Sequence, residues 1–381
     1  MKELMSYYLK NNTLDKNILF IIGTRPELIK MFPIINYLKC AGNKSFRVVS
    51  TGQHKELLRP YWKVFNIKPD YELNIIKKGQ SLSSLTARAI VAIDKLLLGL
   101  TNQFFPEVIV AQGDTTTVMA SSMVAFYHNI KFAHVEAGLR SGDMLNPFPE
   151  EFNRKVAGIT ASYHFAPTMI AKKNLMKESV EEKDIHVVGN TVVDTLHYFK
   201  NSSILDKHQF ARKELLGVKG MVLVTCHRRE NHLYLDELID AIDILSNQNS
   251  KLTFVWPVHP NPSVKGHVLS SKIAKKENVI LTPPLEYLDL LKVISNAKVI
   301  ISDSGGIQEE APSFNVPVLI LRESTERPEA VNIGFSKLVG MSKDSIVNSF
   351  YNFKIHNTKN LMNPYGDGNS SSRIIKIINH E

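Results

Sequence analysis

The sequence predicts an α/β protein made of two similar domains, each built on a parallel β-sheet. Short runs rich in Val and Ile alternate with longer segments of helical periodicity, a pattern typical of strand–helix–strand units. The pattern stops in a polar stretch near 200–220 and then begins again, so two sheets are expected. The length of 381 residues agrees, because it exceeds what one hydrophobic core usually serves.

The expected strands divide the chain into its domains. In the first half they cover 18–23, 46–51, 108–113, 132–138, 163–168 and 185–190, and in the second half 221–227, 252–259, 278–283, 297–305 and 316–322. We expect two Rossmann-like domains over 17–190 and 191–363 that face each other across a cleft. A last helix over 364–381 is expected to return to the first domain, and residues 1–16 to form an extension.

Composition narrows the class of protein and of partner. The hydrophobic share of 44% and the charged share of 22% are those of ordinary globular proteins. The net charge is +9, but the basic residues are scattered among acidic ones, so no nucleic-acid partner is predicted. No apolar run reaches membrane-spanning length and no signal peptide precedes the first strand, so no membrane partner is expected.

The cysteines and the absence of several common motifs exclude other classes. Cys40 and Cys226 lie far apart, so neither a disulfide framework nor a zinc site is predicted, and a cytoplasmic location is expected. The sequence has no G-x-G-x-x-G after its first strand, no phosphate-binding P-loop and no G-x-S-x-G elbow. It therefore does not resemble dinucleotide-binding proteins, P-loop NTPases or serine hydrolases.

The first strand is followed by G-T-R-P-E-L-I-K at 23–30. Thr24 has the position of a helix N-cap and Glu27 the spacing of a capping box, so helix capping explains both residues. Capping does not explain Arg25, which we predict to contact a ligand. For Lys30, ligand binding and an ordinary surface position are equally compatible with the sequence.

The run I-S-D-S-G-G-I-Q-E-E-A-P at 301–312 is the best candidate for a phosphate site. It ends a strand and opens a helix, and two glycines would let backbone N–H groups approach an anion closely. A Gly-Gly pair often marks only a turn, but Ser304, Gly305 and Gly306 are followed by carboxylates. We predict that Glu310 accepts hydrogen bonds from ribose hydroxyls.

Acid and base candidates cluster at three strand ends in the first half. Asp114 lies in Q-G-D-T-T-T, Glu136 in H-V-E-A-G-L-R and Glu150 in N-P-F-P-E-E-F-N-R. Any one of them could be only a helix cap or a partner of Arg140 or Arg154. Three carboxylates at cleft-facing turns favour general acid–base chemistry instead.

Two further candidates come from the second half. His227, in T-C-H-R-R-E-N, follows a strand and could lie over a diphosphate or donate a proton to a leaving group. Arg327, in a second R-P-E run, could bind the same phosphates with two parallel hydrogen bonds, although a surface arginine is the plainer alternative. Apart from His227 and His259, we interpret the histidines near strand ends as hydrogen-bonded loop or core residues.

Taken together, these motifs resemble one family, the bacterial UDP-N-acetylglucosamine 2-epimerases of the non-hydrolysing type. The resemblance runs from Gly23 to the C-terminus. It is carried by GTRPELIKMFP, TGQH, QGDTTT, HVEAGLRSGD, PFPEEFNR, HFAPT, GNTVVDTL, HRREN, HPNP, SDSGGIQEEAPS, TERPEAV and NPYGDGNSSSRI.

The resemblance implies a fold like that of GT-B glycosyltransferases and interconversion of UDP-GlcNAc and UDP-ManNAc without cofactor or metal. The implied course is anti elimination of UDP to 2-acetamidoglucal, then re-addition, to supply ManNAc for cell-surface polysaccharide. It also implies a homodimer. The family's catalytic positions match Asp114, Glu136, Glu150 and His227. Its UDP-sugar-binding positions match Arg25, Lys30, Ser304, Gly305, Gly306, Glu310 and Arg327.

Several alternatives stay open at this point. A hydrolysing epimerase would release UDP and free N-acetylmannosamine, and a relative could act on a modified UDP-sugar. A glycosyltransferase on the same fold would need a groove for an acceptor. A nucleotide-sugar sensor would bind its ligand without turnover. Intact G-T-R-P-E and N-P-Y-G-D-G resemble the non-hydrolysing branch, which is why the isomerase is preferred.

Overall fold

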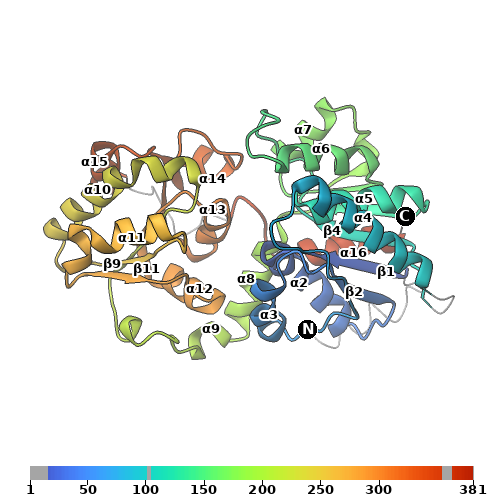
Figure 1. Ribbon diagram of the computed structural model, residues 1–381, viewed down its shortest axis with the longest axis horizontal. Coiled ribbons are helices and arrows are strands. Elements are labelled where there is room, and N and C mark those ends of the chain that lie inside the picture. Colours follow the sequence, from blue (N-terminus) through green and yellow to red (C-terminus); the bar gives the residue numbers. More distant parts are fainter. Residues whose placement is uncertain (1–15, 101–103, 354–362, 381) are drawn as a thin grey trace. The chain divides into compact units, whose positions relative to one another are not determined.

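The computed structural model describes residues 16–100, 104–353 and 363–380. The chain forms two compact units, which we describe separately (Figure 1). The first unit runs to Thr195 and takes in the chain again from Tyr365, and the second runs from Leu196 to Pro364. The expected N-terminal extension, apart from Lys16, lies outside the described residues.

The first unit is a parallel sheet in the order β3-β2-β1-β4-β5-β6-β7. Its strands are β1 (Ile18–Ile22), β2 (Phe46–Ser50), β3 (Tyr71–Glu72), β4 (Val108–Gln112), β5 (Lys131–Val135), β6 (Tyr163–Ala166) and β7 (Ile185–Val187). Its helices are α2 (Arg25–Cys40), α3 (Lys55–Val64), α4 (Leu82–Gly99), α5 (Thr116–Tyr127), α6 (Glu150–Thr160), α7 (Met169–Lys177), α16 (Ser370–His380) and the start of α8 (Thr191–Asn201).

The second unit repeats this design with the strand order β10-β9-β8-β11-β12-β13, again parallel throughout. Its strands are β8 (Met221–Thr225), β9 (Thr253–Pro257), β10 (Val279–Thr282), β11 (Ala297–Ser302), β12 (Val318–Ile320) and β13 (Ser336–Leu338). Its helices are α9 (Ile204–Lys207), α10 (Leu235–Gln248), α11 (Pro262–Ser270), α12 (Tyr287–Asn296), α13 (Gly305–Glu310), α14 (Glu329–Asn332) and α15 (Lys343–Asn352).

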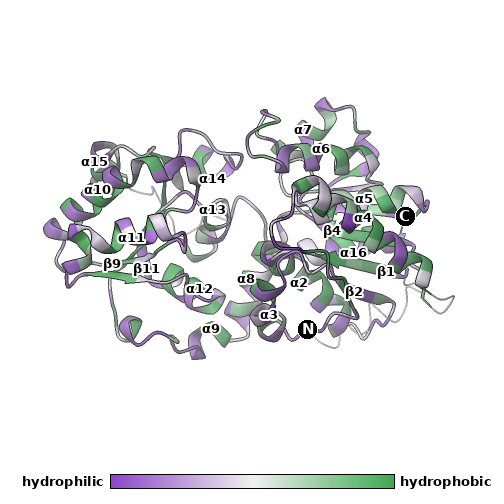
Figure 2. Cartoon of the chain, viewed as in Figure 1, coloured by the Kyte–Doolittle hydropathy of each residue, from purple (hydrophilic) through white to green (hydrophobic). Residues whose placement is uncertain are grey.

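The central strands are buried on both faces. Every residue of β1, β4 and β8 is buried, as parallel strands covered by helices require. Figure 2 shows the hydrophobic colour along the strands and a mixture of colours along the outer helices. None of the helices in the described ranges is long and apolar enough to cross a membrane.

The C-terminal helix α16 is fastened to the first unit at its start. The backbone N–H groups of Ser370 and Ser371 donate to the carboxylate of Asp194, at 3.3 and 2.8 Å. Just before the helix, Tyr365 accepts a backbone hydrogen bond from Asn190 at 2.6 Å. Asp194 therefore satisfies N–H groups that the first turn of a helix leaves without backbone partners.

The predicted α/β class and the two parallel sheets are confirmed. Each predicted strand is present, but several end earlier than predicted, so that Glu136 follows β5 instead of belonging to it. Strands β3 and β13, of two and three residues, were not predicted. They are too short to show an alternating or apolar run.

Two glycines of the loop after β5 give a matched test of backbone packing. Both have positive φ, +87° at Gly138 and +83° at Gly142, but only at Gly138 would a Cβ meet another group, the carbonyl oxygen of Ala171 at 2.3 Å. Gly142→Ala should cost about 1–2 kcal/mol of unfolding free energy from backbone strain alone. Gly138→Ala should cost at least about 2 kcal/mol more, because α7 must move. Urea unfolding of both variants measures the difference, and equal losses would contradict it.

Candidate functional site

Each sheet reverses its strand order at one point, and the candidate residues follow the strands there. In the first sheet β1 and β4 flank the reversal, and in the second β8 and β11 do. Ligands of open parallel sheets bind outside the carboxyl ends of such strands. Arg25 and Asp114 follow β1 and β4, and His227 and Ser304 follow β8 and β11.

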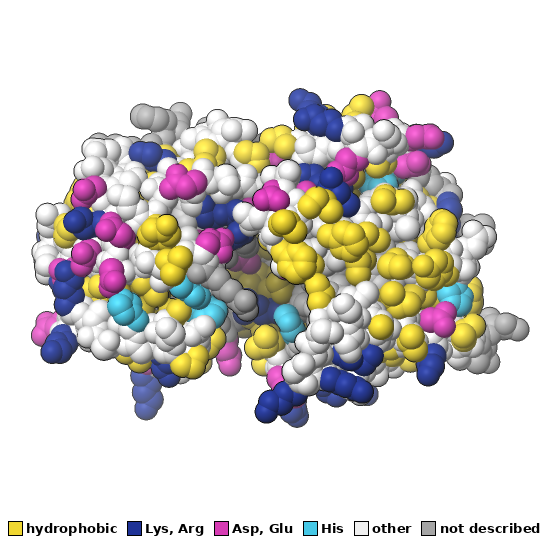
Figure 3. Space-filling view, turned by 45° about the horizontal axis from the view of Figure 1, so that its top comes forward, with side chains coloured by type: hydrophobic (Ala, Val, Ile, Leu, Met, Phe, Trp, Pro, Cys, Tyr) yellow, Lys and Arg dark blue, Asp and Glu magenta, His cyan; other side chains and the backbone are white. Residues whose placement is uncertain are grey.

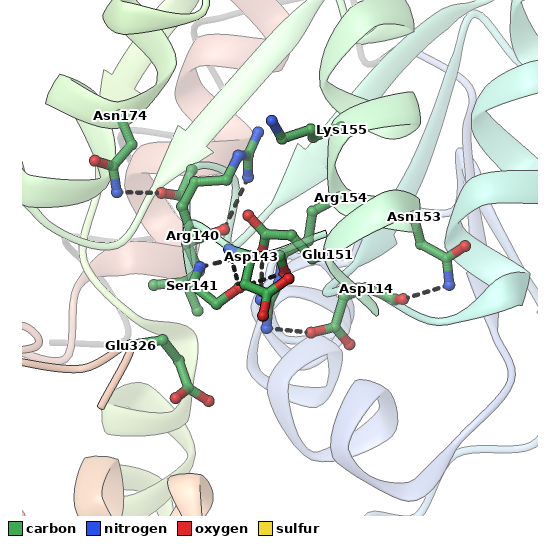
Figure 4. Close-up of polar contacts among 12 residues, drawn as sticks. Asp114, Arg140, Ser141, Asp143, Glu151, Asn153, Arg154, Lys155, Asn174 and Glu326 are labelled. Carbon is green, nitrogen blue, oxygen red and sulfur yellow. Dashed lines mark hydrogen bonds and ion pairs between the residues drawn. The ribbon is translucent and has the colours of Figure 1, made fainter. Parts of the chain in front are cut away.

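Asp114 is held by an ion-pair chain from α6 (Figure 4). Arg154 donates to the Asp114 carboxylate at 2.6 Å and to the Glu151 carboxylate at 3.0 Å. Asn153 also donates to the backbone carbonyl of Asp114, at 2.8 Å. The Arg154 and Glu151 side chains are 5% and 1% exposed, whereas Asp114 is 26% exposed. The buried Arg154–Glu151 ion pair therefore holds the partly exposed carboxylate of Asp114 in place.

Glu151 is a member of this site that the sequence did not single out. Its carboxylate also accepts the backbone N–H of Ser141 at 3.2 Å, which ties α6 to the loop after β5. The predicted Glu150 is the first residue of α6, next to Glu151. The adjacent glutamates therefore differ in role: Glu151 is buried and structural, and Glu150 is half-buried at the helix start.

Glu136 lies in the left-handed backbone region, with φ of +68°. Non-glycine residues seldom adopt this conformation, and such strain often marks a functional residue. Its buried carboxylate pairs with Lys30 of α2 and accepts a hydrogen bond from Asn190 at 3.1 Å. Lys30, for which the sequence left ligand binding and surface exposure open, is therefore buried and paired.

A buried histidine positions the turn that carries Asp114. His134 of β5 makes a hydrogen bond from Nε2 to the carbonyl oxygen of Gly113 at 2.7 Å. Burial lowers the pKa of His134 to about 3, against the opposing effect of that hydrogen bond. The ring is therefore neutral near pH 7 and is a core residue, as the sequence predicted for most of the histidines.

The turn after β1 differs from the predicted capping box. Thr24 is the N-cap of α2, but its side chain accepts no backbone hydrogen bond. Instead its hydroxyl donates to Glu27 at 2.8 Å, and Glu27 also accepts the N–H of Gly23 at 2.7 Å. Thr24 is therefore the N-cap, as predicted, but the predicted capping box is not formed, because the Thr24 hydroxyl donates to Glu27. Arg25 stays exposed beside the Tyr61 ring, 5.7 Å from its centroid.

In the second unit a buried aspartate, Asp303, organises the loop after β8. Its carboxylate accepts the backbone N–H groups of His227 and Arg228 at 2.9 Å, and the side-chain amide of Asn231 at 3.0 Å. Asp303 is fully buried. The His227 side chain is exposed, and its ring lies 6.0 Å from the ring of His259. The sequence placed Asp303 inside the phosphate motif but gave no sign that it holds the His227 loop.

Arg327 lies against the predicted phosphate loop, which precedes α13. The Ser304 side chain caps α13 by accepting the N–H of Ile307. A Cβ at Gly305 would lie 2.7 Å from Arg327 Nη1, so only glycine lets the guanidinium lie against the backbone there. Gly306 has no such close neighbour, since its nearest contact would be 3.9 Å away. Arg327 also pairs with Glu309 of α13.

The predicted ribose ligand, Glu310, already has a protein partner. The Tyr287 hydroxyl donates to its carboxylate at 3.1 Å, and Glu310 is 6% exposed. Tyr287 begins α12, so this hydrogen bond fixes the end of α13 against the neighbouring helix. A carboxylate has further acceptor positions for a ribose hydroxyl.

The described residues contain no group of three or more His, Cys, Asp or Glu side chains arranged to hold a metal ion. The pocket of about 790 Å³ in the first unit lies elsewhere, among Lys39, Phe46, Arg47 and Trp62. Phe46 begins β2 and Lys39 is near the end of α2, so this pocket is at the opposite edge of the sheet from Asp114. This pocket is therefore distinct from the candidate site.

Comparison with known proteins gives a consistent result. Residues 38–379 match the family model described as UDP-N-acetylglucosamine 2-epimerase. The chain is 40% identical over 379 residues to the UDP-N-acetylglucosamine 2-epimerase of Campylobacter jejuni, covering 95% of this chain and 97% of that protein. It is 41% identical over 374 residues to that of Escherichia coli K12, covering 95% and 98%.

A solved structure agrees. The UDP-GlcNAc 2-epimerase from Neisseria meningitidis, bound to UDP-GlcNAc, is 39% identical with a TM-score of 0.85, over 95% of this chain and 99% of that chain. The chain belongs to the UDP-N-acetylglucosamine 2-epimerase family, and its two Rossmann-like units are GT-B-like.

Glu27 provides a pH test of the turn after β1. Burial raises its pKa to about 7, although hydrogen bonds from Gly23, Thr24 and Thr115 oppose the rise. The unfolded chain loses this proton near pH 4.5 and the folded chain near pH 7. The free energy of unfolding should therefore decrease as the pH rises from 4.5 to 7, by at most about 3 kcal/mol. In Glu27→Gln this loss should be absent, so its unfolding free energy relative to wild type should improve from pH 5 to pH 8. A pH-independent difference between the two proteins would refute the assignment.

Proposed function

We propose that this chain is a non-hydrolysing UDP-N-acetylglucosamine 2-epimerase that interconverts UDP-GlcNAc and UDP-ManNAc. The observation that carries the proposal is the division of candidate residues between two switch points. Carboxylates follow the strands of the first unit, and a glycine loop with an arginine follows those of the second. Relatives about 40% identical over nearly the whole chain are UDP-N-acetylglucosamine 2-epimerases.

The chemistry requires two groups of residues. A base removes the proton from C2 of the sugar while the bond between C1 and the UDP oxygen breaks, which leaves 2-acetamidoglucal and UDP. In the return step the UDP oxygen attacks C1, and C2 takes a proton on its opposite face. The reaction therefore needs acid–base groups at the sugar and cations at the departing diphosphate. It needs no net oxidation or reduction, so no redox cofactor is required.

The first unit is proposed to act on the sugar. Asp114, Glu136 and Glu150 are its acid–base candidates, and the first two are held by ion pairs. Arg154 holds Asp114, and Lys30 holds Glu136. Preorganised groups of this kind lose little free energy to rearrangement when the reaction occurs. Arg25, exposed after β1, is proposed to contact the UDP-sugar.

The second unit is proposed to hold UDP. Ser304, Gly305 and Gly306 form the turn before α13, and Arg327 lies against that turn. A guanidinium beside backbone N–H groups suits a diphosphate. Glu310, next to Tyr287, is proposed to accept a ribose hydrogen bond, and His227 to lie over the diphosphate. The resemblance further suggests a cytoplasmic enzyme that supplies ManNAc units for cell-surface polysaccharide.

We also propose a homodimer formed through the outer helices of the first unit. Figure 3 shows hydrophobic side chains gathered on one face of this unit. The neighbouring helices α4, α5 and α6 expose large apolar side chains. They are Val91, Leu98, Phe126, Tyr127 and Ile159. Apolar surface of this kind marks interaction sites on soluble proteins.

Sedimentation analysis of charge variants tests the dimer. The wild type should sediment at twice the chain mass of 43.0 kDa, and Phe126→Glu should shift it towards the monomer because a charge cannot be buried unpaired. Leu233→Glu is the control, since Leu233 is 85% exposed but lies in the second unit. A monomeric wild type, or equal effects of both variants, would count against the proposed interface.

The reaction itself is tested by proton NMR of the purified protein with UDP-GlcNAc in D2O, without acceptor or added metal. We expect a UDP-ManNAc anomeric signal that grows to a plateau while deuterium replaces the C2 proton in both sugars. This exchange follows because elimination releases that proton and re-addition takes one from solvent.

The other outcomes discriminate among the alternatives. Free N-acetylmannosamine with stoichiometric UDP would identify a hydrolysing epimerase and overturn the isomerase proposal. An unchanged spectrum would also overturn it for UDP-GlcNAc. The NMR experiment would then be repeated with modified UDP-sugars, and UDP binding would be measured separately. Turnover of a modified sugar would indicate an enzyme for that sugar, and UDP binding without any turnover would indicate a sensor.

A further inference from the structure

A buried carboxylate in the second unit holds three arginines. Glu326 accepts hydrogen bonds from Arg327 at 2.6 Å, Arg322 at 2.8 Å and Arg228 at 3.3 Å, and its side chain is 5% exposed. The arginines come from separate places: Arg228 follows β8, whereas Arg322 and Arg327 follow β12. Glu326 therefore pairs with arginines from two separate loops of the second unit.

Electrostatics identifies Glu326 as a counter-ion. Burial alone would raise the pKa of Glu326, but the guanidiniums of Arg327, Arg322 and Arg228 hold it well below its usual range. In turn, burial lowers the pKa of Arg322, and Arg228 and Arg327 add to that effect while Glu326 opposes it. The three guanidiniums repel one another, and Glu326 keeps them together.

The segment that carries Glu326 is also fixed to the proposed phosphate loop. Thr325 donates through its hydroxyl to Gln308 of α13 at 2.8 Å and accepts the N–H of Arg327 at 3.1 Å. Arg327 lies against Gly305. The position of Glu326 relative to the loop is therefore set by contacts that do not depend on its own charge.

We infer that Glu326 is a charge-tuning residue: it pairs with Arg327 of the proposed UDP site and with the neighbouring Arg228 and Arg322, and so limits how tightly the site holds a nucleoside diphosphate. This inference rests on the proposed function. With the buried Glu326 and Glu309 as counter-ions, the three arginines leave a net charge of about +1, next to the exposed Glu230. An enzyme that must hold UDP through a glycal intermediate, and still release the UDP-sugar, needs an intermediate affinity. A more positively charged site would slow that release.

The inference sets the direction of a charge experiment. Glu326→Gln keeps the shape of the side chain and removes its charge, so the diphosphate becomes the main counter-ion of the arginines. We expect UDP to bind roughly fivefold more tightly, with a steeper salt dependence. UMP, which lacks the second phosphate, should gain less. Glu230→Gln is the matched control, because Glu230 also pairs with Arg228 but is 61% exposed; it should change UDP affinity less than twofold.

A second variant covers the case in which Glu326→Gln does not fold. Arg322→Gln removes one cation that competes for Glu326, so Glu326 should hold Arg228 and Arg327 more strongly. UDP should then bind several times more weakly. Isothermal titration of UDP and UMP into all four proteins, at two salt concentrations, measures these effects.

The outcomes separate this inference from the proposed reaction. Unchanged or weaker UDP binding in folded Glu326→Gln, or unchanged binding in Arg322→Gln, overturns the inference even if the wild type epimerises. Tighter binding in Glu326→Gln supports it even if no epimerisation is seen. A wild type that binds no UDP would overturn both.

Discussion

The parallel pairing of every strand is the constraint on which the rest of this structure depends. Neighbouring parallel strands require a crossover, so each strand ends at the same edge of its sheet and leads into a loop and helix. Residues far apart in sequence, such as Asp114 after β4 and Arg25 after β1, thereby reach one edge. The same rule places Ser304 and His227 at the corresponding edge of the second sheet.

At these edges the fold holds its charges in buried pairs. Lys30 with Glu136, Arg154 with Glu151, and Arg327 with Glu309 are each mostly buried. Such pairs seldom add net stability, because desolvation offsets the attraction, whereas loss of one partner is costly. Their presence is better explained by orientation than by stability. Each pair fixes a carboxylate or guanidinium whose placement the chemistry would need.

The sequence predicted the framework well and the supporting contacts poorly. Buried parallel strands are continuous apolar runs, so β1 and β8 could be recognised locally, and the turn residues after them could be named. The roles of Asp303 and Glu326 could not, because their partners lie up to 76 and 98 residues away. Thr24 is the N-cap that the sequence predicts, but the capping box is absent, because Glu27 accepts the Thr24 hydroxyl and the N–H of Gly23 instead.

The backbone at Glu136 shows how packing maintains a conformation that the residue itself disfavours. A positive φ costs a non-glycine residue about 1–2 kcal/mol, and glycine would remove that cost. Glycine would also remove the carboxylate that pairs with Lys30 and Asn190. Directly after Glu136, the backbone N–H of Ala137 donates to the carbonyl oxygen of Phe165 in β6, and Gly138 lies against α7. The chain is thus fixed directly after Glu136 and at its carboxylate, and the strain persists because relaxing it would break these contacts or the buried ion pair with Lys30.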